Sequence, residues 1–116
     1  MTISVIVPCY NEEESIPLFY AEMEKIKPRL RDKIEYIFVN DGSQDRTLEV
    51  LHELNMMYPN AHFISFSRNF GKEAALYAGL QHARGELVTV MDVDLQDPPE
   101  LLVEMKTMLD EQKDLD

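Results

Sequence analysis

The sequence predicts an α/β fold with a mainly parallel sheet flanked by helices. Short runs rich in β-branched and aromatic residues alternate with segments whose apolar residues recur every three or four positions, and the alternation occurs four times. Several of the short runs are apolar on nearly every residue, as expected for strands buried on both faces of a parallel sheet. Right-handed crossovers between parallel strands produce this order of elements.

Four strands are expected, and each is a run of strong β-formers. They cover residues 3–7 (ISVIV), 34–39 (IEYIFV), 62–66 (HFISF) and 87–91 (LVTVM). The first is expected to stop at Pro8, because proline has no N–H to donate to a neighbouring strand.

A helix is expected after each strand, from apolar residues at helical spacing. The residues that carry this pattern are, in order, Ile16, Phe19, Met23, Ile26 and Leu30; Leu48, Leu51 and Leu54; Leu76 and Leu80; and Leu101, Met105 and Met108. Asp45 or Thr47 is expected to start the second helix, and Asp97, followed by two prolines, the last.

The totals describe one acidic domain. The chain has 116 residues and 22 acidic against 11 basic side chains, a net charge of -11 that disfavours nucleic acid as a partner. Cys9 is the single cysteine, which excludes an internal disulfide and suits a reducing compartment. Cys9 and the seven methionines are interpreted as core residues, and His52, His62 and His82, which lack a ligand spacing, as helix or surface residues.

A secretory signal at the N-terminus is not expected. No basic and apolar leader precedes the first strand, and no apolar run approaches the roughly 18 to 20 residues that a membrane helix needs, so a cytoplasmic location is expected. The closing residues EQKDLD end a helix and are not followed by the polar tail of a natural terminus, so the chain is interpreted as a fragment of a longer domain.

Polar clusters follow all four predicted strands. They read PCYNEEE, NDGSQD, SRNFGK and DVDLQD. Ligands of open parallel sheets sit beyond the carboxyl ends of the strands, so these clusters are expected on one functional rim.

The fourth cluster is the strongest candidate for a metal site. In an extended chain Asp92, Asp94 and Gln96 share one side. Neighbouring carboxylates repel each other unless a cation lies between them, and oxygen ligands suit Mg²⁺ or Mn²⁺. The alternative is an acidic cap of the next helix, which explains Asp97 and Glu100 but not the two aspartates on the strand.

The other clusters each have a functional and a structural interpretation. Tyr10 offers a ring for stacking a nucleobase and Glu12 a carboxylate, although Asn11 or Glu12 could instead cap the first helix. Asp41 lies in an Asp-Gly-Ser turn, which is ordinary turn chemistry when taken alone. Lys72, with Arg68, offers positive charge to a diphosphate or forms surface ion pairs.

Two nucleotide-binding motifs are absent from the sequence. SRNFGKEAA lacks the first glycine and the Ser or Thr of a phosphate-binding loop, and no G-x-G-x-x-G is present, which argues against a nicotinamide or flavin dinucleotide.

Together, VIVPCYNEEESI, VNDGSQDRT, SRNFGKEAAL and MDVDLQDPPELL resemble the family 2 glycosyltransferases of GT-A fold. The resemblance covers essentially the whole chain and is greatest to the polyprenyl-phosphate branch, which includes dolichol-phosphate mannose synthases and bactoprenol glucosyltransferases. It implies a nucleotide-sugar site made of Pro8, Tyr10, Glu12, Asp41, Asn69, Lys72 and Asp92. It also implies that Asp92, Asp94 and Gln96 hold a divalent cation, Mg²⁺ or Mn²⁺.

The resemblance implies an inverting transfer of a sugar to a polyprenyl phosphate. UDP-glucose is the favoured donor and GDP-mannose the second. A lipid phosphate is already an anion at neutral pH, so it needs little help from a general base. The acceptor-side catalytic residues and any membrane association are expected beyond residue 116, and a homo-oligomer is left open.

Residues 1–116 are therefore interpreted as the nucleotide-sugar-binding half of a GT-A domain. Asp114, Leu115 and Asp116 resemble the start of the next strand in the family. We expect the chain alone to bind donor and metal weakly and not to turn over.

Three alternatives remain at this point. One is a family 2 transferase that acts on a polysaccharide or lipid-sugar hydroxyl. A second is a receiver-like Mg²⁺-binding signalling domain, which would need an acidic pair directly after the first strand and a lysine after a fifth. The third is a non-enzymatic nucleotide-binding module.

Overall fold

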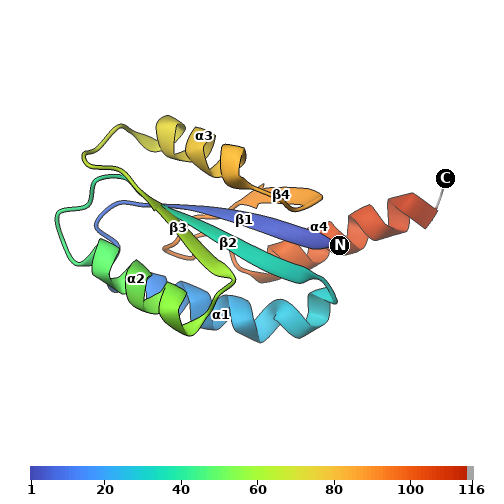
Figure 1. The fold of residues 1–116 in the computed structure, drawn as a ribbon. Helices are drawn as coiled ribbons and strands as arrows, with labels where there is room; N and C mark the ends of the chain where they lie inside the picture. The colour runs from blue at the N-terminus through green and yellow to red at the C-terminus, as the bar shows by residue number, and fades with distance from the viewer. Residues whose placement is uncertain (115–116) are drawn as a thin grey trace.

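The computed structural model describes residues 1–114 and shows four parallel strands flanked by four helices (Figure 1). In order they are β1 (Thr2–Cys9), α1 (Ser15–Leu30), β2 (Lys33–Asn40), α2 (Thr47–Met57), β3 (Ala61–Ser65), α3 (Lys72–His82), β4 (Leu87–Val90) and α4 (Glu100–Asp114). The predicted fold class is confirmed, and the predicted strand limits differ from the observed ones by at most two residues.

The sheet has the strand order β3-β2-β1-β4. The chain steps from β1 through β2 to β3 and then returns to the other side of β1 as β4, with every pairing parallel. Val5, for example, pairs with Tyr36 on one side and Thr89 on the other. The strand order reverses between β1 and β4, and such a switch point is where open α/β sheets bind ligands. The receiver-like alternative would have β1 between β2 and β3, which this sheet does not have.

The prediction that the first strand stops at Pro8 is wrong. The strand continues to Cys9, whose carbonyl accepts a hydrogen bond from the Asp41 amide at 2.9 Å. Alternate residues of β1 face β4, and the pairing with β4 ends at Ile6 opposite Val90. The nitrogen of Pro8 therefore lies beyond the last paired residue on that side, where no strand requires its missing N–H.

The two faces of the sheet are covered differently. Figure 1 shows α3 on one face, and α1 and α2 on the other. On the α1 face Phe19 meets the rings of Tyr36 and Phe38 edge-on, with centroids 6.4 and 6.1 Å away. On the α3 face the helix buries Ala75 and Gly79, and a Cβ at Gly79 would lie 2.5 Å from Ile6 Cγ2. Small residues thus let α3 approach the sheet closely.

The fourth strand is not buried on both faces, which corrects the interpretation of LVTV. Val88 and Val90 are 37% and 43% exposed. Register places them beside Ser4 and Ile6, on the face that α3 covers only partly. An apolar run cannot by itself distinguish an inner strand from one at the edge of the sheet.

Most methionines are also outside the core, contrary to expectation. Met23 and Met91 are buried, whereas Met1, Met56, Met57, Met105 and Met108 are exposed. Leu80 and Leu101, which were used to predict α3 and α4, are exposed as well. Cys9 is buried as predicted, and the three histidines lie on the surface.

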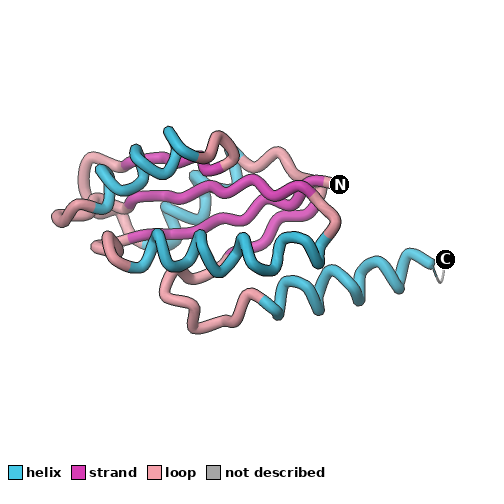
Figure 2. The backbone as a smooth tube through the Cα atoms, turned by 90° about the horizontal axis from the view of Figure 1, so that it is seen from below, coloured by secondary structure: helices cyan, strands magenta, loops and turns pink. Residues whose placement is uncertain are grey.

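The last helix extends beyond the sheet (Figure 2). Its attachment is partly polar, because the nearly buried Lys106 lies 2.6 Å from Asp110 and 3.3 Å from Asp32 in the α1–β2 turn. Asp114 is the last residue of α4 rather than the start of a strand, and residues 115 and 116 lie outside the described part. None of the helices within residues 1–114 has the length and apolar character needed to span a bilayer.

Candidate functional site

The four polar clusters meet at one rim of the sheet, as predicted. They enclose a cleft of about 190 Å³ between the ends of β1 and β4. Its lining residues are Pro8, Cys9, Tyr10, Glu12, Asp41, Lys72, Asp92, Val93 and Asp94. The cleft therefore coincides with the switch point of the sheet and contains most of the predicted site residues. Asn69 and Gln96 are the predicted residues that do not line it.

We number the loops that follow β1, β2, β3 and β4 as the first to the fourth. Hydrogen bonds that the sequence did not indicate connect the first loop to the second. Asn11, whose φ is 54°, donates its amide N–H to Ser43 Oγ at 2.9 Å, and its own side-chain oxygen accepts from the Gln44 amide at 2.8 Å. The Glu12 amide donates to Thr47 Oγ1 at 2.9 Å. The partners lie more than thirty positions away in the sequence, so no local motif signals them.

These contacts also settle how α1 begins. Neither Asn11 nor Glu12 caps it with a side chain; instead the Glu12 carbonyl accepts from the amides of Ser15 and Ile16 at 3.1 and 3.2 Å. The side chains of Tyr10 and Glu12 are left to line the cleft, where Tyr10 is exposed.

Asp45 also connects the loops after β1 and β2, just before α2. The helix begins at Thr47, one of the two predicted start residues, and its N-cap is Arg46, which makes no side-chain cap bond. Its carboxylate accepts from the Thr47 amide at 2.9 Å, from the Thr47 hydroxyl, and from the Glu13 amide at 3.3 Å. Burial alone would raise the pKa of Asp45, but the hydrogen bonds from Thr47 and Glu13 outweigh it and lower the pKa.

Asp41 joins the second loop to the third. It is 5% exposed, and its carboxylate accepts from the amides of Phe70 at 2.7 Å and Gly71 at 3.0 Å. The Asn69 side-chain amide donates to Asp41 Oδ2 at 3.3 Å and to the Asp41 carbonyl at 3.2 Å. Asn69 therefore faces Asp41, which explains why it does not line the cleft.

The third loop meets the fourth through a pair of opposite charges. Lys72, the first residue of α3, places its Nζ 3.3 Å from Asp92 Oδ1. Both side chains are solvent-accessible, so the pair adds little stability, but it puts a cation beside a carboxylate inside the cleft. Arg68, by contrast, lies over the Phe70 ring, with its guanidinium carbon 5.0 Å from the centroid.

The two aspartates of the fourth cluster follow the strand rather than lie on it. β4 ends at Val90, and the chain then turns. The predicted alternation survives in part, because Met91 and Val93 are buried while Asp92 and Asp94 reach the cleft.

A turn at Leu95 ends the alternation before Gln96, which does not line the cleft. Leu95 has a φ of 62° and donates its amide to the Asp92 carbonyl at 3.3 Å, and the Gln96 amide donates to Asp94 Oδ1 at 3.3 Å. The side chain of Gln96 is exposed.

The donor atoms suit a hard divalent cation that is shared with a ligand. Within residues 1–114 no three Asp, Glu, His or Cys side chains lie close enough to enclose a metal ion by themselves. Asp92 and Asp94 nevertheless offer two carboxylates on one wall of the cleft. Mg²⁺ is commonly held by one or two carboxylates plus phosphate oxygens, so the residues fit such an ion.

Cys9 lies against the cleft but is not a nucleophile. Burial, and then the charge of Glu12, raises the pKa of its thiol far above the usual range. The thiol therefore stays protonated at neutral pH and packs as an apolar group.

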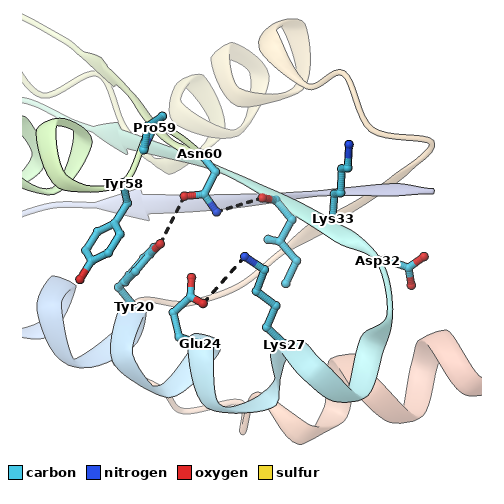
Figure 3. A pocket seen from close by; sticks show the side chains of 9 residues that line it. Tyr20, Glu24, Lys27, Asp32, Lys33, Tyr58, Pro59 and Asn60 are labelled. Carbon is cyan, nitrogen blue, oxygen red and sulfur yellow. Dashed lines mark hydrogen bonds and ion pairs between the residues drawn. The ribbon is translucent and has the colours of Figure 1, made fainter.

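A larger cavity, of about 620 Å³, opens at the opposite, amino-terminal end of the strands (Figure 3). Several of its polar groups are bonded to one another: Tyr20 donates to Asn60 Oδ1 at 3.2 Å, Asn60 donates to the Ile34 carbonyl at 3.2 Å, and Lys27 lies 3.9 Å from Glu24. The cleft at the rim, with its clustered carboxylates and lysine, is the better candidate despite its smaller volume.

The sequence and the fold match glycosyl transferases. The glycosyl transferase family 2 profile matches residues 4–115. A bactoprenol glucosyl transferase of Shigella phage SfX is 49% identical over 105 residues, which cover 88% of this chain and 33% of that protein. This chain spans about a third of the length of such relatives.

Solved structures of the same fold include two with bound sugar nucleotides. A Pyrobaculum calidifontis mannosyltransferase in complex with GDP-Man and Mn²⁺ has a TM-score of 0.74 and 30% identity, over 90% of this chain and 31% of that one. S. aureus TarS in complex with UDP-GlcNAc has a TM-score of 0.70 and 28% identity, over 96% and 32%. The predicted GT-A fold and the predicted resemblance to bactoprenol transferases are both confirmed.

Proposed function

Because this chain belongs to glycosyl transferase family 2, we propose that its rim cleft binds a sugar nucleotide and a divalent cation, for sugar transfer to a polyprenyl phosphate. The observation that carries the proposal is the convergence of Tyr10, Glu12, Lys72, Asp92 and Asp94 on one cleft at the switch point of the sheet. Residues 1–116 then form the donor-binding half of the transferase domain.

The cleft divides into a base end and a diphosphate end. The exposed ring of Tyr10 supplies a stacking surface for the base, and we assign Pro8 and Glu12, which also line the cleft, to the same end. Lys72 supplies positive charge for the diphosphate, and it can exchange Asp92 for a phosphate oxygen because the pair is solvent-accessible.

A divalent cation, Mg²⁺ or Mn²⁺, would be held by Asp92, Asp94 and the diphosphate, with Gln96 joining by a side-chain rotation. Such an ion supplies charge neutralisation of the leaving nucleoside diphosphate. The Mn²⁺ and GDP-Man of the Pyrobaculum neighbour support this assignment.

A polyprenyl phosphate is the proposed acceptor, since the relatives are named for bactoprenol. A phosphate acceptor arrives as an anion and needs little general-base help, which is consistent with in-line displacement and inversion at the sugar. Because this acceptor is a lipid, we propose that the reaction takes place at the cytoplasmic surface of a membrane. We also propose that the residues that bind the acceptor lie in the rest of a longer protein.

The donor half is tested by calorimetric titration of the chain with UDP and GDP, each with and without Mn²⁺. We expect Mn²⁺-dependent binding of UDP in preference to GDP, since several relatives are named glucosyl transferases. Asp94→Asn should weaken it at least tenfold, roughly the loss of one charge-assisted contact. Glu53→Gln, which removes an exposed carboxylate of α2, is the matched control and should bind like the parent.

Preference for GDP would reassign the donor without changing the class of enzyme. Binding of neither nucleotide, with the fold intact by circular dichroism, would contradict a donor site within these residues. Metal-dependent binding without transfer by a longer chain would favour a nucleotide-binding module instead.

A further inference from the structure

Asn11 lies in the sequence between two of the residues that we assign to the base end of the cleft, Tyr10 and Glu12. We propose that Asn11 is a positioning residue, which holds the first loop against the second so that both of these side chains line the cleft. This inference rests on the proposed donor site and adds to it a residue that does not itself line the cleft.

The first argument is the backbone of Asn11. β1 ends at Cys9, and the chain turns before α1 begins at Ser15. Asn11 forms part of this turn with a φ of 54°, in the left-handed region that glycine, asparagine and aspartate adopt more readily than other residues. The residue type at this position therefore favours the observed path of the first loop.

The second argument is the pair of bonds that joins Asn11 to the second loop. The Asn11 N–H donates to Ser43 Oγ at 2.9 Å, and Asn11 Oδ1 accepts from the Gln44 amide at 2.8 Å. We call these two bonds the Asn11 clip. Because a donor and an acceptor of one residue meet two successive residues of the other loop, the clip fixes both the distance and the orientation between the loops. Figure 1 shows the two loops side by side, beyond the ends of β1 and β2.

The third argument is that the second loop is a fixed support for the clip. The Ser43 amide donates to Asn40 Oδ1 at 3.1 Å, and Asn40 Nδ2 donates to Ser65 Oγ at 3.1 Å. Asn40 is 2% exposed and is the last residue of β2. Ser43 is therefore bonded to the end of the sheet, and the Asn11 clip extends this support to the first loop.

The side chains on either side of Asn11 depend on this support. Within residues 1–114 neither Tyr10 nor Glu12 makes a side-chain hydrogen bond or ion pair. Their directions are therefore set by the backbone, which the clip and the bond from the Glu12 amide to Thr47 Oγ1 hold in place. Loss of the clip should disturb the base end of the cleft and leave the diphosphate end unchanged.

The test measures the preference between two bases. UDP and GDP are titrated with Mn²⁺ into the parent and into Asn11→Gly, which tolerates the left-handed backbone but removes the acceptor for Gln44. We expect the preferred nucleotide to bind about fivefold more weakly and the ratio of the two affinities to fall at least threefold. Equal weakening of both nucleotides would indicate a general loosening of the site and overturn the proposal, as would no weakening of either.

Rescue by the conservative variant separates the clip from the rest of the loop. Asn11→Asp keeps both the left-handed backbone and an acceptor oxygen, so it should bind within about twofold of the parent. An Asp variant as weak as the Gly variant would contradict the proposal. Gln44→Ala is the matched control, because the clip uses only the backbone amide of Gln44 and its side chain is exposed.

A double-mutant cycle tests whether the two bonds act together. Ser43→Ala removes the acceptor of the Asn11 N–H and should weaken the preferred nucleotide about threefold. On this background Asn11→Gly should add less than about a further twofold, because the clip is already broken. Full additivity of the two losses would contradict a single clip.

Hydrogen exchange tests the clip without any ligand. The amide of Gln44 should exchange at least about fivefold faster in Asn11→Gly, and the amide of Asn11 should do so in Ser43→Ala, while the amides of β1 and β2 stay protected. Unchanged exchange at these two amides would overturn the proposal. If the parent binds neither nucleotide, the proposed function fails, and this measurement still decides whether Asn11 holds the two loops together.

Discussion

The two faces of the sheet differ in the size of their cores and in what they contribute to the molecule. On the α1 face, large buried side chains such as Phe19, Tyr36 and Phe38 form the main core together with β1, α2 and α4. On the α3 face the core is small, and Ala75 and Gly79 bring the helix close to the strands. We call the α1 face the thick face and the α3 face the thin face. The thick face provides most of the stability. The thin face determines where the amino end of α3, and with it Lys72, lies at the rim.

The largest effect is expected from breaking the thick face. Phe19→Ala should lower the free energy of unfolding by about 4 kcal/mol, because Phe19 is fully buried and the rings of Tyr36 and Phe38 cannot close the cavity. The neighbouring Leu18 is exposed, so Leu18→Ala should cost less than about 0.5 kcal/mol. Urea denaturation measures both, and similar losses for the two variants would show that α1 does not pack as described.

A smaller loss of stability is expected on the thin face, together with an effect on the site. Gly79→Val should lower the free energy of unfolding, measured by urea denaturation, by about 2 kcal/mol, because the added side-chain atoms would overlap Ile6 Cγ2. It should also weaken UDP binding, since α3 must move away from the sheet and carry Lys72 with it. Gln81→Val, on the exposed side of the same helix, is the control for β-branching.

Removal of the facing side chain sharpens this test. Ile6→Ala opens space opposite Gly79, so the double variant should be more stable than the sum of the two single losses predicts. Strict additivity would mean that Gly79 and Ile6 do not limit the approach of α3.

The same contrast explains what could be predicted from the sequence. On the thick face burial follows helical period, and Ile16, Phe19, Met23, Ile26 and Leu30 are all buried as expected. On the thin face the period misleads, because small residues make the contact and Leu80 is 54% exposed. The exposure of β4 could not be predicted either, because β4 is exposed by its position at the edge of the sheet. That position depends on strand order and not on local composition.

The site follows the same rule. Side chains that project into the cleft, such as Tyr10 and Lys72, could be found because they follow strands that the pattern locates. Bonds between the loops could not, because Asn11 finds Ser43, and Asp41 finds Phe70, only after the strands are ordered. Gln96 was placed by extending the alternation of β4 into a segment that instead turns at Leu95.

The smallest effect is expected at the rim, where Asp45 joins two loops without entering either core. Its folded-state pKa is lowered below the ordinary value of 3.8, so its stabilising contribution is complete above that pH and is lost as pH falls through the folded-state pKa. Asp45→Asn should lower the free energy of unfolding by about 1 kcal/mol at neutral pH, because the amide keeps one oxygen for Thr47 but loses the oxygen that accepts from the Glu13 amide. Urea denaturation across the acid range should show the stabilities of parent and variant converging as the pH falls through the folded-state pKa of Asp45. Asp97→Asn, which removes an exposed carboxylate, is the control at neutral pH and should change the free energy of unfolding by less than about 0.5 kcal/mol. A cost for Asp45→Asn that persists in acid would mean that the amide disrupts packing, and that the ionised carboxylate is not what ties the first loop to the start of α2.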